Sequence, residues 1–491
     1  MIKPEVPFEG ISLSINTHNF CNHKCSYCYE RNRPVNLEWE YDFWNKATTP
    51  DGKRLNHRVT MPTNWGSTNL DGNPIQLEYI KKFYDYMLKS EDPLHILGTE
   101  DEWLYDKGAV LDFIGGDSMQ YPELLHQSLK YWAQQMILLD HKWQGHWRAS
   151  VSSNGTTLLD PRAREVAEYW KDVMSLGISI DGCPELHDSN RHTFANQSNG
   201  ELQGSWQFIE KIIPWWQKHF PHNAQSSKWT LGGTNYHYIM QSVKFMYDVL
   251  GIKYIQFNRA MEDDIITTPS DIEIAYEQFS ELVQWTLERD DSVYISPFSY
   301  HFFAKDVKSL NECMVEDPNF RRCGYSNMPT LAHDGHIYTC FRLLPAHLEP
   351  GSTYNLQQFS AGHINDLNPM GNKENILWLR EDSVLCNQLM PEKCKICPIL
   401  SSCPSCAAGN LIKGLSVGKK KHMLTSSTCE WAKLQIIFAT KYWLLFNAKH
   451  PENKDYPITE KQAQLAEQLD REIHHYIKTG EYINLTNNIG D

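Results

Sequence analysis

The sequence predicts an α/β fold built on a parallel sheet, followed by a smaller cysteine-rich region and C-terminal helices. Two observations lead to this prediction. Apolar runs rich in β-branched residues alternate with helix-like segments over the first half of the chain, and nine of the thirteen cysteines lie between Cys313 and Cys429. Alternating strands and helices are typical of βα units, which form parallel sheets. With 491 residues, of which 41% are hydrophobic, the chain is long enough for two or three domains.

Six runs have the length and composition expected of strands. They are residues 11–16, 110–116, 148–155, 175–182, 228–233 and 252–258. Six such units are compatible with a partial barrel or with an open sheet, and the pattern does not choose between them. In both folds ligands bind at the carboxyl ends of the strands, and polar or glycine-containing motifs follow these runs.

Between the first two runs, the sequence predicts an insertion and then a helix. Residues 31–71 are polar and lack clear periodicity, which predicts an inserted loop or cap. Asn73 as N-cap and Pro74 at the first helical position then begin a helix. Its apolar residues recur at the spacing of one buried face, at Ile80, Phe83, Tyr84 and Met87.

A last helix is predicted near the C-terminus. Thr459 and Gln462 have the spacing of a capping box, and Gly480 is suited to end the helix. The residues between them carry one apolar stripe, so this helix packs against the rest of the protein.

The net charge argues against a nucleic-acid-binding protein, and the hydropathy argues against a membrane protein. The net charge is -14, from 46 basic and 60 acidic residues, whereas nucleic-acid binding favours a basic domain. The N-terminus lacks the apolar core of a signal peptide, and nowhere do 18 apolar residues run together, so we expect no membrane span and a cytoplasmic location. In that reducing setting, clustered cysteines indicate metal binding rather than disulfides.

The first cysteine cluster directly follows the first predicted strand. Cys21, Cys25 and Cys28 have the spacing C-x3-C-x2-C. Soft thiolates select zinc, copper or iron-sulfur clusters. A structural zinc site needs four ligands, so His18 or His23 would have to supply the fourth. A 4Fe-4S cluster held by three cysteines instead leaves one iron open to a substrate.

This cluster resembles the signature of radical S-adenosylmethionine (radical SAM) enzymes, in which an aromatic residue, here Tyr27, precedes the last cysteine. The resemblance implies a partial (β/α)6 barrel of the TIM type. It also implies that SAM binds the open iron of a 4Fe-4S cluster on Cys21, Cys25 and Cys28.

Further motifs after the second, third and fourth runs resemble the SAM-binding motifs of this family. They are "FIGGDS" at 113–118, "SSNG" at 152–155, and "SIDG" with "HDSNR" at 179–191. The family usually has Glu-Pro where this chain has Asp117 and Ser118. The resemblance implies SAM contacts from Tyr27, Gly115, Gly116, Asp117, Ser153, Asn154, Ser179 and Arg191. The end of the sixth run, Gln256 to Arg259, faces either SAM or substrate.

The second cysteine set resembles the SPASM extension of radical SAM enzymes, which holds two auxiliary 4Fe-4S clusters. Its spacing is C-x11-G-x4-C from Cys323, then C-x2-C-x5-C-x2-C and a final cysteine. The resemblance implies one cluster on Cys394, Cys397, Cys403 and Cys429. It implies another on Cys323, Cys340 and Cys406, completed by Cys313, with Cys386 as the competitor for that position. A zinc ribbon on four of these cysteines is the alternative.

The division expected from these motifs is a radical SAM core at 1–300, including the insert at 31–71, a SPASM domain at 301–435 and a helical tail at 436–491. The cofactors would be SAM and three 4Fe-4S clusters. We expect the enzyme to form a thioether or carbon-carbon crosslink in a ribosomally made precursor peptide. A formylglycine-forming sulfatase maturase is the alternative, although Phe341 and Arg342 follow Cys340 where that group has an acidic residue.

Other classes stay open at this point: a multi-cluster electron-transfer protein without chemistry of its own, or a zinc-organised binding module. As partners we expect the precursor peptide and an electron donor such as flavodoxin or ferredoxin. Because Cys21 lies near the start of the sequence, we expect the leader of the peptide to be bound by residues 31–71, by the tail, or by a separate protein.

Overall fold

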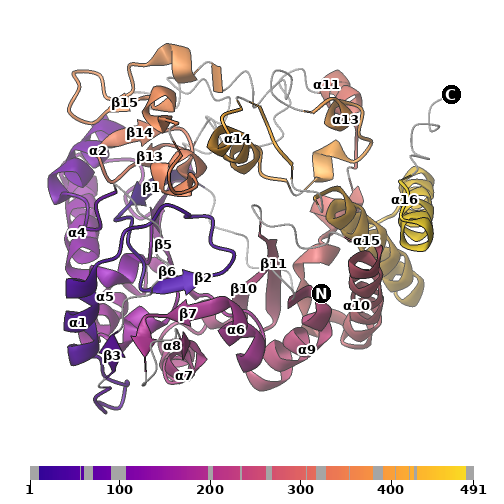
Figure 1. The fold of residues 1–491 in the computed structure, drawn as a ribbon, viewed down its shortest axis with the longest axis horizontal. Helices are drawn as coiled ribbons and strands as arrows, with labels where there is room; N and C mark the ends of the chain where they lie inside the picture. Colours follow the sequence, from indigo (N-terminus) through magenta and orange to yellow (C-terminus); the bar gives the residue numbers. More distant parts are fainter. Residues whose placement is uncertain are drawn as a thin grey trace.

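The structure is a computed structural model (Figure 1). It describes residues 10–55, 57–59, 70–89, 107–196, 203–232, 235–260, 268–305, 307–316, 328–352, 354–376, 378–379, 391–403, 405–419, 421–424 and 428–482.

All six predicted strands are present and parallel. They are β1 (Ile11–Asn16), β4 (Ala109–Ile114), β5 (Trp147–Ser153), β6 (Met174–Ile178), β10 (Ser226–Leu231) and β11 (Tyr254–Arg259). β1, β4, β5 and β6 are neighbours in one sheet, a parallel bridge from Ser179 to Lys228 joins β6 to β10, and β10 pairs with β11. The strand prediction is therefore confirmed, and the sheet follows the order of a partial (β/α)6 barrel.

Both ends of this barrel sheet are extended by short strands. β12 (Tyr294–Ile295) pairs in parallel with β11. At the other end β13 (Thr330–Leu331) pairs in parallel with β1, and β14 (His336–Tyr338) and β15 (Gly362–His363) follow it as antiparallel strands. The cysteine-rich region therefore begins as a continuation of the barrel sheet.

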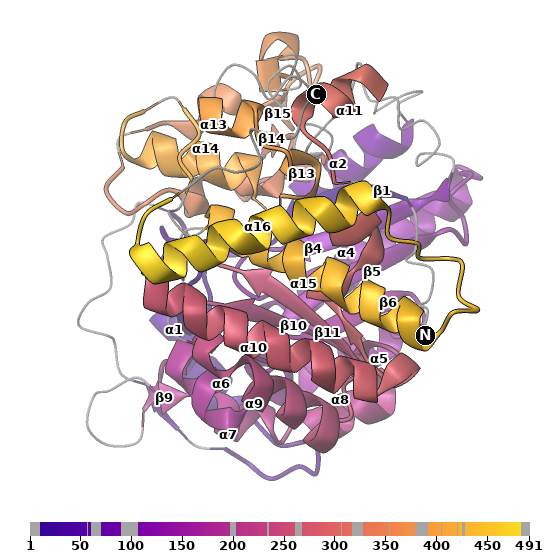
Figure 2. The same ribbon diagram turned by 90° about the vertical axis from the view of Figure 1, so that its right-hand side faces the viewer.

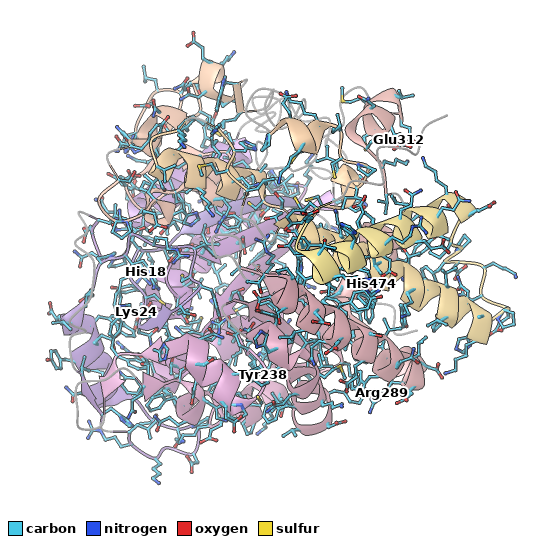
Figure 3. The ribbon with its side chains drawn as sticks, turned by 45° about the vertical axis from the view of Figure 1, so that its right-hand side comes forward. His18, Lys24, Tyr238, Arg289, Glu312 and His474 are labelled. Carbon is cyan, nitrogen blue, oxygen red and sulfur yellow. The ribbon has the colours of Figure 1, made fainter. Side chains whose placement is uncertain are left out.

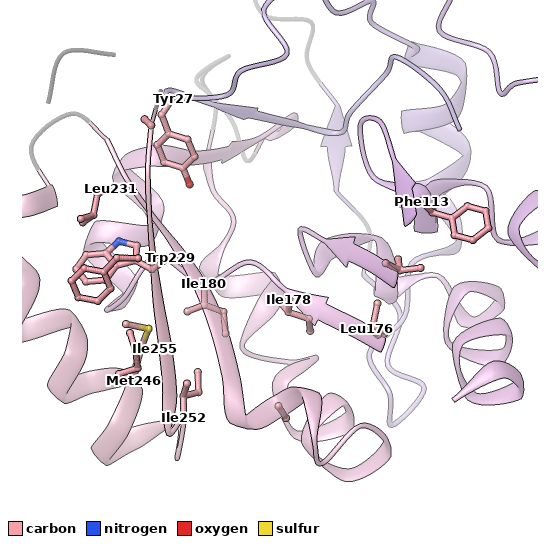
Figure 4. Close-up of a cluster of buried hydrophobic side chains, with 14 of the residues drawn as sticks. Tyr27, Phe113, Leu176, Ile178, Ile180, Trp229, Leu231, Met246, Ile252 and Ile255 are labelled. Atoms are coloured by element: carbon pink, nitrogen blue, oxygen red, sulfur yellow. The ribbon is translucent and has the colours of Figure 1, made fainter. Parts of the chain in front are cut away.

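The two faces of the barrel strands differ in character. Outward residues such as Leu13, Leu111 and Trp229 are fully buried in the main core. Figure 4 shows Trp229 and Ile255 on two neighbouring strands close to Met246, which follows a helix on the outside. Helices cover this face: α2 (Leu77–Lys89), α4 (Pro122–Leu138), α5 (Pro161–Trp170), α6 (Pro184–Asn190), α7 (Trp206–Ile209), α8 (Ile213–His219), α9 (Ile239–Lys244) and α10 (Pro269–Glu288).

The insertion is more ordered than its sequence indicated. Residues 31–71 contain α1 (Leu37–Lys46), whose N-cap Asn36 accepts a hydrogen bond from the Trp39 backbone. Phe43 and Trp44 are buried, and the Trp44 indole donates to buried Glu40 at 3.0 Å. The prediction of a loop was wrong for this part, because aromatic contacts stabilise a helix that lacks a regular apolar stripe.

Helix α2 has the predicted buried face but a later start. Ile80, Phe83, Tyr84 and Met87 are all buried. The helix begins at Leu77, and the backbone and side-chain amides of Asn73 both donate to Asp71. Asn73 therefore forms a turn with Asp71 and does not cap the helix.

The C-terminal part is helical. α15 (Thr428–Lys449) packs against α10 and α16 (Glu460–Thr479), and Figure 2 shows α16 lying across both. The predicted capping box of Thr459 with Gln462 is present, and Gly480 ends α16 with a φ of 73°. No described helix is long and apolar enough to cross a membrane.

The cysteine-rich region also contains α11 (Leu310–Glu316), α13 (Glu392–Lys395) and α14 (Ala407–Ser416). A separate small core around Tyr338, Leu343 and Leu411 includes Cys340 and packs against Cys406. Short strands complete the described elements: β2 (His23–Cys25), β3 (Arg58–Val59), β7 (Arg191–Thr193), β8 (Ala195–Asn196) and β9 (Gln203–Gly204).

Candidate active site at the carboxyl ends of the barrel strands

The cysteine loop starts where β1 ends and is held at its middle by strand pairing. Cys21 is buried, and Cys25 and Cys28 are partly buried. β2 pairs antiparallel with β7, which places Cys25 directly opposite Arg191. The loop is therefore fixed to the barrel by backbone hydrogen bonds as well as by side chains.

Gly115 and Gly116 let the end of β4 approach this loop. A Cβ on Gly116 would lie 1.5 Å from the Phe20 carbonyl oxygen, and one on Gly115 would lie 2.4 Å from the His18 carbonyl oxygen. Backbone atoms cannot yield by such distances, and Gly115 also has a φ of 118°. These glycines therefore make room for the cysteine loop, and their expected contact with SAM stays a prediction.

Asn154, at the end of β5, contacts the first cysteine directly. Its side-chain nitrogen donates to Cys21 Sγ at 3.9 Å and to Asn22 Oδ1 at 2.7 Å. Its oxygen accepts from the backbone of Thr156 at 3.0 Å. The amide is therefore fixed in the orientation that presents N–H to sulfur, and hydrogen bonds to sulfur tune the potential of iron-sulfur clusters.

Asp117 holds the ends of β4 and β5 together. Its Oδ2 accepts hydrogen bonds from Ser153 Oγ at 2.9 Å and from the Asn154 backbone at 2.7 Å, and its Oδ1 accepts from the Met119 backbone at 3.0 Å. Burial raises the pKa of Asp117 to about 6, against the effect of these hydrogen bonds. The expected acceptor for the SAM amino group is thus already engaged in positioning Asn154.

Arg191 connects the cysteine loop to the end of β6. Its guanidinium forms two hydrogen bonds to the Asp181 carboxylate, at 2.9 and 3.2 Å, and points a third N–H at Cys25 Sγ at 4.0 Å. The Tyr27 hydroxyl donates to the same carboxylate, and its ring lies under the guanidinium. The carboxylate that Arg191 binds is therefore supplied by the chain.

The thiols lie in a low-dielectric setting with cations beside them. Burial raises the pKa of Cys25 to about 11, which Arg191 opposes, and raises the pKa of Cys21 well above its usual value, which Arg33 opposes. Arg33 is buried and donates to the His23 carbonyl oxygen at 3.0 Å. Thiolates here need positive charge, which the two arginines provide and iron ions would add to.

The two histidines of this loop are held by the protein. His18 Nδ1 contacts Thr17 Oγ1 and its Nε2 contacts Gln120 Oε1, both at 2.9 Å. Burial lowers the pKa of His18 to about 4 and that of His23 well below its usual value. His23 Nε2 contacts Thr156 Oγ1. His18 would have to give up a hydrogen bond to become a zinc ligand.

Polar residues line the inward face of the barrel. The side chains of Ser152, Lys228 and Asn258 are exposed, although each lies on a barrel strand that is paired with its neighbours: β5, β10 and β11 respectively. Burial raises the pKa of Asp112 on β4, while Ser150 and Lys228 oppose the shift, so Asp112 and Lys228 interact across the interior. Filled TIM barrels pack bulky apolar residues here. This barrel interior is instead open to solvent or a ligand.

The comparisons with known proteins agree with this geometry. No known sequence family and no curated protein matches the chain. Among solved structures, the anaerobic sulfatase maturating enzyme anSMEcpe with bound AdoMet and the Cp18Cys peptide matches with a TM-score of 0.55 and 15% identity, over 90% of this chain and 100% of that one. The same enzyme with AdoMet alone matches with a TM-score of 0.55 over 89% of this chain.

The chain shares the fold of this AdoMet-binding enzyme. SuiB from Streptococcus suis, solved with S-adenosylmethionine, also matches, with a TM-score of 0.44 and 12% identity over 86% of this chain and 75% of that one. The match to anSMEcpe confirms the fold that was expected, including a cysteine-rich C-terminal region.

One group of cysteines distant in sequence from the first loop is linked by electrostatic interactions. The thiol of Cys397 interacts with those of Cys403, Cys429 and Cys394, and burial raises its pKa to about 12. These are the four residues that the SPASM resemblance assigns to one auxiliary cluster. In the described part of the chain, no three His, Cys, Asp or Glu side chains converge as the ligands of a single metal ion.

The other auxiliary set is only partly described. Cys340 and Cys406 share the small core near α14, whereas Cys323 and Cys386 lie outside the described residues. Cys313 is buried on α11, beside Glu312, which forms an ion pair with Lys461 on α16 (Figure 3). Its place in this set stays a prediction.

A second group of residues joins the first cysteine loop to Cys340. The Arg342 guanidinium lies 4.3 Å from the centre of the Tyr29 ring, and the backbone of Asn32 donates to the Ala346 carbonyl oxygen at 2.9 Å. Burial raises the pKa of Glu30 to about 7, against the effect of Arg33 and Arg342. The two cysteine regions of the fold are therefore in direct contact.

Sequence reasoning missed three side chains of this site: Asp181, Arg33 and Arg342. Asp181 belongs to the recognised "SIDG" motif, but its bond to Arg191 depends on the β2–β7 pairing, which has no local signal. The only sequence signal for Arg33 and Arg342 is that each follows a cysteine closely.

Proposed function

We propose that this chain is a radical SAM enzyme that forms a thioether or carbon-carbon crosslink in a ribosomally made precursor peptide. The observation that carries the proposal is the pair of N–H donors on two of the three thiols, Asn154 on Cys21 and Arg191 on Cys25, at the carboxyl end of an open barrel. A structural zinc site would need a fourth ligand beside the three thiols, and both ring nitrogens of His18 are engaged in other hydrogen bonds.

Cys21, Cys25 and Cys28 would hold a 4Fe-4S cluster. When bound and reduced, this cluster supplies the electron that cleaves SAM to methionine and a 5'-deoxyadenosyl radical, which removes hydrogen from an unactivated carbon. The chain's own part is to position and to shield. Asn154 and Arg191 stabilise negative charge on the sulfurs, and burial of Cys21 excludes water.

For SAM, the residues at the ends of β4 to β6 are the proposed contacts. Ser179 and the exposed side of Ser152 lie on the inward face, whereas Asp117 and Ser153 are engaged with each other. We therefore assign Asp117 to positioning and leave Ser179, together with the backbone at Gly115 and Gly116, to contact SAM.

Two auxiliary 4Fe-4S clusters are proposed for the SPASM region. Cys394, Cys397, Cys403 and Cys429 are the proposed ligands of one, which the electrostatic interaction of Cys397 with the other three supports. Their role would be to take up the electron left when the substrate radical forms its new bond. A flavodoxin or ferredoxin would supply electrons to the first cluster, and a separate protein could bind the leader of the peptide.

The peptide is supported as substrate by two observations. The barrel interior carries exposed polar side chains, so it has room beyond SAM. A structure of anSMEcpe, whose fold this chain shares, contains both AdoMet and a peptide.

Anaerobic reconstitution tests the proposal. The loaded protein should contain about twelve irons, from three clusters of four, and should form 5'-deoxyadenosine from SAM after reduction. Replacing Cys21, Cys25 and Cys28 by alanine should remove this product but leave the auxiliary iron. Bound zinc without iron would overturn the enzyme proposal, and iron without 5'-deoxyadenosine would leave an electron-transfer protein.

Formylglycine formation is the second candidate, favoured by the shared fold with anSMEcpe. Arg342 and Phe341 stand where that group has its acidic residue, so we rank it below crosslinking. Co-expression with short reading frames beside the gene separates the two. A crosslink removes a pair of hydrogens and keeps the sulfur in the peptide, whereas formylglycine formation from cysteine removes the sulfur.

A further inference from the structure

A cavity of about 360 Å³ lies at the end of the sixth barrel strand, β11. β11 forms one side, and α15 and the π-helix η8 (His301–Lys305) contribute the others. β12 pairs with β11 only at Tyr254 and Ile255, so the residues after Ile255 lie beyond the paired part of that edge. The volume is at the lower end for small-ligand pockets, which suits one side chain and its flanking amides.

Side-chain amides supply most of the polar lining of this cavity. Gln435, on α15, is only 4% exposed, and its Oε1 accepts no hydrogen bond within the described part of the chain. A buried acceptor of this kind is normally satisfied. An N–H donor from a ligand would satisfy it.

Gln256 and Asn258 line the cavity from β11. They are two residues apart, so both point to the inward face of the barrel. Neither side chain forms a hydrogen bond with another described residue, and both are at least partly exposed. They are available to donate to and accept from the amides of a peptide.

Aromatic side chains supply the apolar lining. Phe302 is 70% exposed on η8, Phe303 and Tyr294 are partly buried, and Trp431 is fully buried on α15. Among the described lining residues Arg259 alone is charged, and its guanidinium donates to Thr428 Oγ1 at 2.9 Å. The lining therefore favours a neutral aromatic ring over a charged side chain, since rings pack well edge to face.

We propose that this cavity binds one aromatic residue of the substrate peptide, with its ring among Tyr294, Phe302 and Phe303 and its backbone N–H donating to Gln435. The inference rests on the proposed function, in that the peptide enters the open barrel beside the cavity. It goes beyond the proposed function because it requires that the substrate peptide carry an aromatic residue near the residue that is modified.

Binding of N-acetylphenylalaninamide to the reconstituted protein tests the inference by calorimetry or ligand-observed NMR. N-acetylalaninamide and N-acetyllysinamide serve as the matched probes. We expect the phenylalanine amide to bind roughly tenfold more tightly than either of the other two amides. This ratio corresponds to the binding free energy of one aromatic contact and the apolar area that it buries. Equal binding of the three amides would overturn the proposal.

Two variants and a control locate the site. Phe302→Ala and Gln435→Met should each weaken binding of the phenylalanine amide by roughly tenfold, through the ring contact and the lost acceptor. Tyr169, which is 69% exposed on α5, is the matched surface aromatic, and Tyr169→Ala should leave binding unchanged. If Phe302→Ala behaves like Tyr169→Ala, the amide binds elsewhere and the inference is wrong.

Two measurements, of amide binding and of SAM cleavage, separate this inference from the proposed function. Binding that depends on Phe302, without any 5'-deoxyadenosine from SAM, would refute the radical mechanism and support the aromatic site. SAM cleavage without selective binding of the phenylalanine amide would support the mechanism and refute the site.

Discussion

The side-chain nitrogen of Asn154 lies 3.9 Å from Cys21 Sγ, and the carboxylate of Asp117 holds the Asn154 backbone at 2.7 Å. These two hydrogen bonds, from Asn154 to Asp117 and from Asn154 to Cys21, link the ends of β4 and β5 to the first cysteine. A residue that the sequence marked as a ligand contact is thus also a donor to sulfur.

Asn154→Asp should lower the reduction potential of the cluster on the first three cysteines. The change replaces an N–H donor by a carboxylate oxygen, and hydrogen bonds to charged groups contribute about 1.5–3 kcal/mol, so we expect a shift of roughly 60 mV or more. An anaerobic redox titration followed by EPR measures it. Asn223→Asp is the control, because Asn223 donates to Ser175 far from the cysteines, and a similar shift there would contradict the assignment.

Arg191→Gln should destabilise the protein by about 3–5 kcal/mol, because it leaves the Asp181 carboxylate buried and unpaired. Denaturant unfolding measures the loss, and Asp181→Asn in the same protein should recover part of it. The ion pair of Arg471 with Glu467 is the exposed comparison. Arg471→Gln should change the free energy of unfolding by less than about 1 kcal/mol. If the two variants lost equal stability, the buried Arg191 pair would contribute no more than an exposed pair.

Gly116→Ala should displace the cysteine loop, because its Cβ would lie 1.5 Å from the Phe20 carbonyl oxygen. We expect reduced iron content after reconstitution and a lower melting temperature. A Cβ on Gly177 would meet nothing within 4 Å. Gly177→Ala should therefore retain iron, and full iron content in Gly116→Ala would show that the loop can move aside.

The contribution of His18 to the stability of the iron-free protein should be lost as the pH is lowered from about 6.5 to about 4, whereas Asp117 and Glu30, whose pKa values are raised to about 6 and about 7, contribute in the opposite direction. The pKa of buried His18 is lowered to about 4, whereas an unfolded histidine titrates near 6.5. In this window the unfolded state binds the extra proton, so protonation favours unfolding by roughly 3 kcal/mol in total.

His18→Gln should lower the slope of the unfolding free energy against pH between about 4 and 6.5, relative to the wild type. His474, on α16 and more than half exposed, is the control, and Figure 3 shows it on the other side of the molecule from His18. His474→Gln should leave the slope as it is in the wild type. A wild-type slope in His18→Gln would assign the pH dependence to other groups.

Cys397→Ser together with Cys429→Ser should lower the iron content from about twelve to about eight per chain, because only one cluster of four irons is lost. Formation of 5'-deoxyadenosine without peptide should continue, while peptide crosslinking should stop. Cys183→Ser should change neither, since Cys183 is the N-cap residue of α6 and belongs to none of the proposed cluster ligand sets. Loss of all iron in the double variant would instead indicate one shared site.

Residue spacing along the sequence correctly predicted the secondary-structure features that depend on neighbouring residues. The strands, the buried face of α2 and the capping box of α16 all follow from residue spacing within a few turns. The helix in residues 31–71 was missed because its stability comes from contacts of Phe43 and Trp44, which have no fixed spacing.

The site was predicted in its parts but not in its connections. The motifs located Cys21, Asp117, Asn154 and Arg191, yet gave the last three to SAM. Their observed partners are each other, Cys21 and Cys25, and Asp181. Such partners lie 10 to 166 residues apart in sequence, so only the folded chain can show which of two possible acceptors a buried donor meets.

The pairing of β13 with β1 has a consequence for electron transfer. Ser14 and Thr330 are partners in one continuous sheet, and the first cysteine loop and Cys340 both follow from that ladder within a few residues. The separation between the two cysteine regions is therefore set by backbone hydrogen bonds and not by a hinge. An electron that leaves the barrel toward Cys340 would travel over a distance that is fixed when the protein folds.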